Sequence, residues 1–308
     1  MVRRSALIAL ALLLITATTT FISGYMISGT HAGGILFSLS LIAILGGHEM
    51  GHYLYGRKYG VSITLPWFIP APPFLSPIGT FGAFIRIKSQ IRSRKELFDI
   101  GVAGPIAGIV VALPVLFVGL LFSDVVALDS ERISEMQTAM SLGNSIVFSF
   151  FSKMALGPIA EGYEIILHPL AFAGWIGLFV TVLNLMPAGQ LDGGHIIYSV
   201  FPAEWHRIVS SVTVVSLVIM GVGTAPLLDL ADYLGLGVLD TIPEWLVFEG
   251  WAGWLFWAIL LVVIGTSHPP TLLDDAGIGA GRKALALFSL LVFVSCFTPV
   301  PISIVDFG

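Results

Sequence analysis

The sequence has few charged residues and almost no cysteine. Of its 308 residues, 11% are Asp, Glu, Lys or Arg, whereas a soluble domain typically carries about 25%. The single cysteine, Cys296, excludes an internal disulfide and a metal site built from several thiolates. No basic stripe with interleaved aromatic residues is present, so the sequence gives no support for nucleic-acid binding.

Apolar residues are abundant instead. They make up 56% of the chain, and the mean hydropathy is +0.95. A membrane-spanning helix needs roughly 20 mostly apolar residues. We therefore predict an all-α membrane protein, a polytopic bundle of six or seven transmembrane helices. The candidate spans cover approximately residues 5–26, 32–56, 99–123, 166–188, 208–226, 248–267 and 284–304.

Lys and Arg indicate an orientation, because they concentrate in cytoplasmic loops. With a cytoplasmic N-terminus and seven alternating spans, only Arg132 and Lys153 of the 14 basic residues lie outside, and the other 12 lie inside. We predict a multi-pass protein of a prokaryotic cell membrane. Its first apolar run is expected to be a retained helix, because it exceeds the usual length of a signal-peptide core.

One polar motif interrupts the second apolar run. It reads His48-Glu49-Met50-Gly51-His52. On a helix, His48 and His52 share a face and can bind one ion, and Glu49 can reach a water on that ion. Ionisable side chains in a span are costly and usually functional. The motif predicts a zinc hydrolase site, and a catalytic zinc needs a third protein ligand.

Two residues near the end of the fourth run are candidates for that third ligand. Asp192 lies in the segment Leu191-Asp192-Gly193-Gly194-His195, and His195 is its rival. Pro187 and the paired glycines are expected to break the helix there, which a membrane protein tolerates where backbone lines a cavity. Spacing alone leaves the choice between Asp192 and His195 open.

His-Glu-Met-Gly-His followed by Asn-x-x-Pro-x-x-x-Leu-Asp-Gly, starting at Asn184, resembles the site-2 protease family of intramembrane zinc metalloproteases. The resemblance covers about residues 40–200. It implies one Zn²⁺ per chain, bound by His48, His52 and Asp192. It also implies that Glu49 activates water as the general base and that Asn184 helps to stabilise the oxyanion. His195 is a candidate support for Asp192.

The resemblance also implies an activity. Family members cleave transmembrane segments of single-span membrane proteins within the lipid bilayer, often after an upstream site-1-type protease has made a first cut. We expect one transmembrane domain over residues 1–308, with a catalytic core at about 32–200. No PDZ domain or soluble regulatory domain is expected, which differs from many relatives.

A proline-rich stretch follows the second run. Residues 66–88 contain five prolines, so we predict a re-entrant or interfacial β-hairpin rather than a helix. Within it, residues 79–88 are expected to form a short strand or hairpin. Its edge is a candidate site for an unwound substrate backbone. In the third run, Gly101, Gly104 and Gly108 indicate close helix packing.

Two other functions remain open from the residues alone. The first is a membrane metal-ion transporter or channel that uses the His/Asp cluster as a binding site. The second is a zinc protease of the prenyl-processing kind, whose third ligand is usually a Glu, and the Leu191-Asp192-Gly193 context argues against it. His206 and His268, at the ends of runs, are expected at the membrane interface.

Overall fold

The computed structural model describes residues 2–130, 133, 138–236, 242–243, 247–273 and 277–306. This part of the chain is mostly helical, with three two-stranded sheets. The helices are α1 (Val2–Ser28), α2 (His31–Lys58), α3 (Arg94–Leu121), α5 (Ile146–Leu156), α6 (Pro169–Leu185), α7 (Asp192–Val200), α8 (Ala203–Val222), α9 (Ala225–Tyr233), α10 (Ala252–Ile264) and α11 (Ala280–Cys296). The strands are β1 (Trp67–Pro70), β2 (Thr80–Phe84), β3 (Asp124–Ala127), β4 (Thr138–Leu142), β5 (Tyr163–Ile166) and β6 (Ile302–Asp306).

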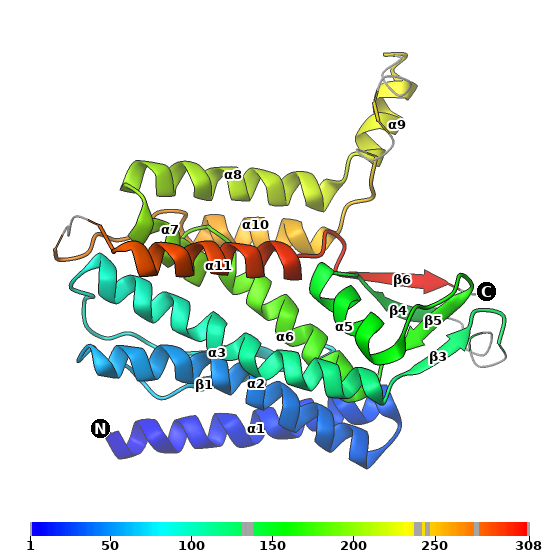
Figure 1. The fold of residues 1–308 in the computed structure, drawn as a ribbon, viewed down its shortest axis with the longest axis horizontal. Helices are drawn as coiled ribbons and strands as arrows, with labels where there is room; N and C mark the ends of the chain where they lie inside the picture. The colour runs from blue at the N-terminus through cyan, green and yellow to red at the C-terminus, as the bar shows by residue number, and fades with distance from the viewer. Residues whose placement is uncertain are drawn as a thin grey trace.

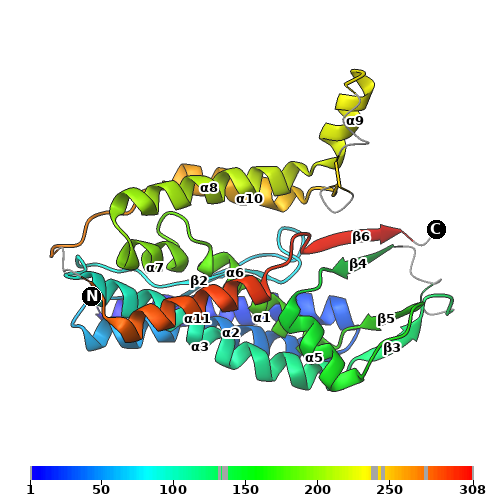
Figure 2. The ribbon, with the colours of Figure 1, turned by 45° about the horizontal axis from the view of Figure 1, so that its top comes forward.

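The long helices lie side by side, and the two ends of the bundle differ. Figure 1 shows α1, α2 and α3 along one side, with α6 crossing behind them. α8 and α10 form a separate layer, which is most evident in Figure 2. The start of α1 and the helix α7 lie at one end of the molecule, while β3 to β6 lie at the other.

Each of the seven predicted spans contains a helix. Four of these helices, α1, α2, α3 and α8, are long and apolar enough to cross a membrane. The helices α6 and α10 have 17 and 13 residues and are shorter than a usual span. The protein is thus a membrane protein, and the number of six or seven spans stays a prediction. Among the described residues, α5 and α7 are further helices outside the predicted runs, and α9 begins at the end of the fifth run.

Local sequence determines where the helices that carry the site begin. The Thr30 hydroxyl accepts a hydrogen bond from the Gly33 amide and caps α2. The Ser93 hydroxyl does the same for the Glu96 amide at the start of α3. Such N-caps satisfy backbone donors that have no partner within the helix. The capped starts fix where α2 and α3 enter the bundle.

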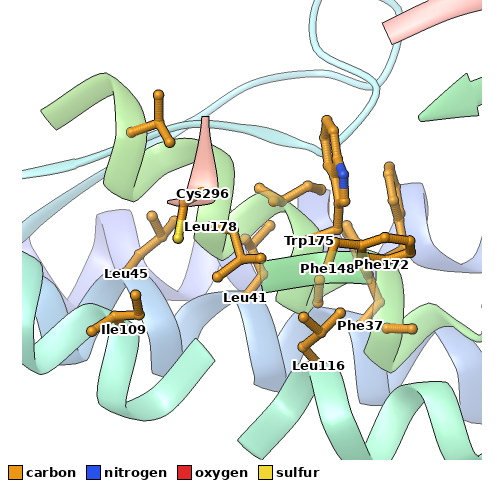
Figure 3. Packing of buried hydrophobic residues seen from close by; sticks show 14 of the residues in the cluster. Phe37, Leu41, Leu45, Ile109, Leu116, Phe148, Phe172, Trp175, Leu178 and Cys296 are labelled. Atoms are coloured by element: carbon orange, nitrogen blue, oxygen red, sulfur yellow. The ribbon is translucent and has the colours of Figure 1, made fainter. Parts of the chain in front are cut away.

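The main hydrophobic core lies between α2, α3, α6 and α11. Figure 3 shows Phe37 and Leu41 of α2 packed with Leu116 of α3 and with Phe172 and Leu178 of α6. The rings of Phe37 and Phe172 are stacked with their centroids 5.6 Å apart. These contacts hold α2 against α6, the helix that leads to Asp192.

The strand pair after α2 differs in detail from the predicted one. β1 and β2 are antiparallel, with Trp67 opposite Phe84 and Phe68 opposite Ala83. Of the two forms expected for residues 79–88, a short strand or a hairpin, the structure has the strand β2, and its partner β1 comes from the earlier part of the 66–88 stretch. The Thr19 hydroxyl of α1 donates to the Gly79 carbonyl at 2.6 Å. This bond ties the hairpin to the first helix. Its re-entrant or interfacial position stays a prediction.

Two further small sheets were not expected from the sequence. β3 pairs with β5, and β4 pairs with β6, both antiparallel. Their strands are four or five residues long. Each pair joins segments that are far apart in the chain, so no local turn signal marks it.

One ion pair joins three elements at the end of the bundle near α7. The Arg282 guanidinium of α11 donates from Nε to Oδ1 of Asp99 at 2.7 Å, and from Nη2 to Oδ2 at 2.8 Å. The Tyr59 hydroxyl, just after α2, donates to the same Asp99 carboxylate. This two-point geometry is the strong form of an Arg–carboxylate pair. It links α11 to α2 and α3.

Replacing Asp99 with Asn removes this ion pair and should lower the free energy of unfolding by about 1–2 kcal/mol. The loss is limited to this range because Arg282 is one-third exposed and partly screened. Reversible unfolding in detergent micelles measures this change. The matched control is Lys283→Gln, which removes an exposed charge from the next position of α11 and should change the free energy by less than about 0.5 kcal/mol. Equal effects of the two variants would contradict a role for the ion pair in holding α11.

Candidate metal centre

Three side chains that are far apart in the sequence meet at one point. Nε2 of His48 lies 3.1 Å from Nε2 of His52, and Oδ2 of Asp192 lies 3.2 Å from each of these nitrogens. Both imidazoles are buried. Among the described residues, these three form the group of His and carboxylate side chains that is arranged to hold a metal ion.

The neighbours of His52 determine which ring nitrogen faces this point. Nδ1 of His52 lies 2.8 Å from the carbonyl oxygen of Ile100. A carbonyl can only accept, so Nδ1 carries the hydrogen and the neutral ring presents the lone pair of Nε2 to His48 and Asp192. Such a hydrogen bond to a backbone carbonyl fixes the tautomer of a metal-binding histidine.

The three atoms fit a small divalent cation. Zinc bonds of about 2.0–2.1 Å in a tetrahedron place neighbouring ligand atoms about 3.3 Å apart. The observed separations are 3.1 and 3.2 Å. The lone pair on Nε2 of His52 and the Asp192 carboxylate repel at this distance, and a shared cation stabilises them. Two nitrogens and one oxygen are a donor set that zinc accepts.

The elements that carry these residues explain their approach. His48 and His52 lie one turn apart on α2. Asp192 is the first residue of α7, because the chain leaves the helical conformation after α6 at Met186 and re-enters it at Asp192. This break agrees with the one expected from Pro187 and the paired glycines. The start of a helix is a favourable place for a carboxylate, since the first amides have no helical partner.

Glu49 is buried beside the two histidines, with 7% of its surface exposed. The backbone of Ile85, which follows β2, lies beside the Glu49 carboxylate. The β1–β2 hairpin therefore reaches the same site as α2. A buried carboxylate next to a candidate metal position, with a strand against it, has the parts that a hydrolytic site needs.

Glycines of α3 line the back of the site. A Cβ on Gly104 would lie 2.0 Å from Nε2 of His52, and one on Gly108 would lie 3.2 Å from Cβ of His48. The sequence indicated close helix packing by these glycines. The structure adds that the packing partners are the two imidazoles themselves. A larger residue at position 104 has no room.

Asn184 and His195 take different positions. Asn184 is half-buried in the last turn of α6, before the break that leads to Asp192. His195 lies one turn after Asp192 on α7, and its Nδ1 is 2.7 Å from Nε2 of His268. His195 is not in the metal-binding group of the described residues.

His206, expected at the interface, is buried, and its Nε2 donates to the Gly189 carbonyl. Spacing offered no signal for this contact.

The comparisons with known proteins agree with this site. Residues 36–226 match the family model described as peptidase family M50. The chain is 32% identical over 257 residues to "Probable zinc metalloprotease EGY1, chloroplastic" of Oryza sativa subsp. japonica, which covers 82% of this chain and 38% of the relative. It is 34% identical over 169 residues to "Probable zinc metalloprotease EGY2, chloroplastic" of Arabidopsis thaliana, covering 54% and 29%.

The matched family region includes all the predicted site residues, from His48 to Asp192, and extends over more than half of the chain. The chain therefore belongs to peptidase family M50, the site-2 protease family of zinc metalloproteases. It spans well under half the length of the curated relatives given above.

Proposed function

We propose that this protein is an intramembrane zinc endopeptidase that cleaves transmembrane segments of single-span membrane proteins. The observation that carries the proposal is the convergence of His48, His52 and Asp192 on one point beside the buried Glu49. Their place among long apolar helices suits a substrate that is itself in the membrane. A further partner in this proposal is an upstream site-1-type protease, which makes a first cut in the substrate.

The residues have separable roles in the proposed reaction. His48, His52 and Asp192 would hold one zinc ion, which supplies a Lewis acid that acidifies water and polarises a carbonyl. Glu49 takes a proton from the attacking water and delivers it to the nitrogen of the leaving amine. Asn184 donates a hydrogen bond to the oxygen of the scissile carbonyl. Burial of the site limits competition by bulk water for these groups.

The β1–β2 hairpin supports a way to bind an unwound substrate. The Thr64 amide donates to the Arg86 carbonyl, and the Arg86 amide donates to the Thr64 hydroxyl, so the Arg86 backbone faces its partner strand. Backbone groups alternate sides along a strand. Those of Ala83 and Ile85 therefore face the opposite edge, which pairs with no other strand among the described residues and where Ile85 meets Glu49. We propose that this edge captures the substrate backbone by strand addition.

A proline at position 83 should weaken substrate binding. Ala83→Pro removes one N–H from the free edge and leaves the bonds to β1, because Pro is tolerated at unpaired strand positions. The loss of one backbone hydrogen bond, about 1 kcal/mol, should lower kcat/KM about fivefold. Steady-state cleavage of a single-span substrate measures it.

Ala83→Ser is the matched control, because it keeps the N–H and adds one atom. Both variants should bind zinc as the parent does. If Ala83→Ser loses as much activity as Ala83→Pro, the free edge is not the binding element.

Orientation in the membrane is also a proposal. The start of α1 and strand β6 lie at opposite ends of the molecule, which fits an odd number of crossings (Figure 1). The excess of Lys and Arg in the loops on the α7 side supports a cytoplasmic position of that end. We propose that the zinc site opens there. A prokaryotic cell membrane stays a prediction, because the names of the curated relatives given above are chloroplastic.

Removal and return of the metal test the proposed function. Treatment of the purified protein with a chelator should abolish cleavage of a single-span substrate in liposomes, and one equivalent of Zn²⁺ per chain should restore it. A metal-ion transporter or channel, which the residues alone left open, would move the ion across the liposome membrane without cutting any substrate. Cleavage that persists in the metal-free protein would refute the proposal.

A further inference from the structure

The turn that leads into Asp192 is hydrogen-bonded to α8, a helix that contributes none of the three proposed metal ligands. Gly189 has a positive φ of 55° and lies in the bend between α6 and α7. Its amide donates to Oγ of Ser210 at 3.1 Å, and its carbonyl accepts from Nε2 of His206 at 3.1 Å. Both side chains come from α8. The two polar backbone groups of Gly189 are thus both bonded to α8.

The hydrogen bonds of Ser210 and His206 to Gly189 differ from those that polar residues of apolar helices usually make within their own helix. Ser152, Thr181 and Ser289 donate to the carbonyl four residues earlier in their own helices, which satisfies a hydroxyl locally. Ser210 instead accepts from another segment, and His206 reaches the same residue from the preceding turn of α8. Both are almost fully buried. A buried imidazole in an apolar layer is costly unless it is paired, and this one is paired with the Asp192 turn.

A second anchor holds the chain on the other side of Asp192. Nδ1 of His268 lies 2.6 Å from the Pro269 carbonyl, which can only accept, so Nδ1 carries the hydrogen. Burial lowers the pKa of His268 to about 4, and the ring is therefore neutral near pH 7. Nε2 of His268 then accepts from Nδ1 of His195 at 2.7 Å.

The ring of His268 is also fixed in place. It stacks on Tyr198 of α7, with the centroids 4.2 Å apart and the planes 22° from parallel. His268 belongs to the segment between α10 and α11, which contributes none of the three proposed metal ligands. A histidine from a distant segment is therefore bonded to α7 one turn after the carboxylate.

We propose that His206 and Ser210, together with His268 acting through His195, are positioning residues that hold Asp192 in the geometry required for metal binding. The proposal rests on the proposed function, because it takes Asp192 as a ligand. Gly189 lies three residues before Asp192 and His195 three residues after it. Two anchors of this kind fix the path of the backbone at the start of α7. Groups that orient a ligand in this way typically change metal affinity by 10–100-fold when they are removed.

Metal affinity of the full-length protein in detergent is the informative readout, because a residue that only packs α8 against the bundle would not change it. Competition with a chromophoric chelator gives the affinity for Zn²⁺, and the visible absorption of bound Co²⁺ reports the ligand geometry. We expect His206→Leu and Ser210→Ala to weaken Zn²⁺ binding about 10–100-fold and to alter the Co²⁺ spectrum. His206→Gln, which keeps a donor near the position of Nε2, should stay within about threefold of the parent.

His268→Leu and His268→Gln form a second matched pair on a half-buried loop residue. Leu removes the acceptor for His195 and should weaken binding about tenfold, whereas Gln offers an amide oxygen as acceptor and should restore most of it. If His206→Leu fails to fold, the His268 variants and Ser210→Ala still show whether these residues change the affinity for Zn²⁺. Parental Zn²⁺ affinity and Co²⁺ spectra in folded Ser210→Ala and His268→Leu would overturn the proposal.

The same experiment separates this proposal from the proposed function. If the parent protein binds one Zn²⁺ and His48→Ala abolishes binding, but no substrate is cut, the protease assignment fails while the positioning result remains valid. If the parent cuts its substrate and all positioning variants bind Zn²⁺ as it does, only the positioning proposal fails.

Discussion

Glu49→Gln should abolish cleavage while the protein still binds one zinc ion. Glu49 is buried between the two histidines of α2 and is the proposed base for the attacking water. A glutamine has nearly the same shape but cannot take up the proton. General-base catalysis contributes about 10²–10⁴-fold, and we expect a loss in kcat in that range. The measurement is single-turnover cleavage of a single-span substrate, with zinc content determined on the same preparation.

Glu161→Gln provides a control for this prediction. It makes the same chemical change at an exposed position between α5 and β5, at the opposite end of the bundle from α7. It should leave kcat unchanged. Full activity of Glu49→Gln would refute the assignment of Glu49 as the base, and loss of zinc from that variant would assign Glu49 to metal binding instead. A transport function would tolerate Glu49→Gln, so the variant also separates the protease from a metal-ion transporter or channel.

Gly104→Ala should remove the metal site without unfolding the protein. The added Cβ would lie 2.0 Å from Nε2 of His52, the atom proposed to bind the ion. The imidazole must move, and its hydrogen bond to the Ile100 carbonyl must change with it. Ala favours a helix by about 0.5–1 kcal/mol over Gly, so α3 itself should form. We expect the affinity for Zn²⁺ to fall at least about 100-fold, the upper end of the effect of disturbing a ligand's support.

Gly46→Ala is the matched control on the facing helix. A Cβ there would meet Cζ of Phe68 at 3.5 Å, an ordinary van der Waals contact. Zinc affinity and cleavage should stay near the parental values. Titration of the purified variants with Zn²⁺ in the presence of a competing chelator measures the difference. Parental zinc affinity in Gly104→Ala would mean that His52 does not bind the metal through Nε2.

The parts of the site that sequence predicted are those encoded by local spacing. His48, Glu49 and His52 lie on one helix, where residues four apart share a face whatever the rest of the chain does. Asp192 comes from a different segment, so spacing alone does not decide whether Asp192 or His195 is the third ligand. Only the resemblance favours Asp192. Its approach to the histidines depends on how α6 ends and how α7 packs against α3, which is tertiary information.

The glycine face of α3 shows the same limit. Sequence identified Gly104 and Gly108 as small residues at helix-packing spacing. It did not indicate that the residues packed against them are His52 and His48. Likewise, His206 lies near the end of an apolar run, which predicts an interfacial position but not its burial against Gly189. A single histidine carries no pattern that reveals its partner.

The fold was predicted best where long apolar runs define helices. All seven runs contain helices, although α6 ends before the predicted boundary, because Met186 and Pro187 break it. The sheets β3–β5 and β4–β6 were missed. Their strands are short and pair across long stretches of chain, so neither alternation nor a hairpin turn indicates them.

The most direct test of the account is to map the bond that the purified protein cuts. A single-span substrate is incubated with the zinc-loaded protein in liposomes, and the two product ends are identified by mass spectrometry. The account predicts one or a few cuts inside the apolar span of the substrate. Cuts confined to the water-exposed parts of the substrate, or intact substrate beside protein that holds one zinc per chain, would contradict it.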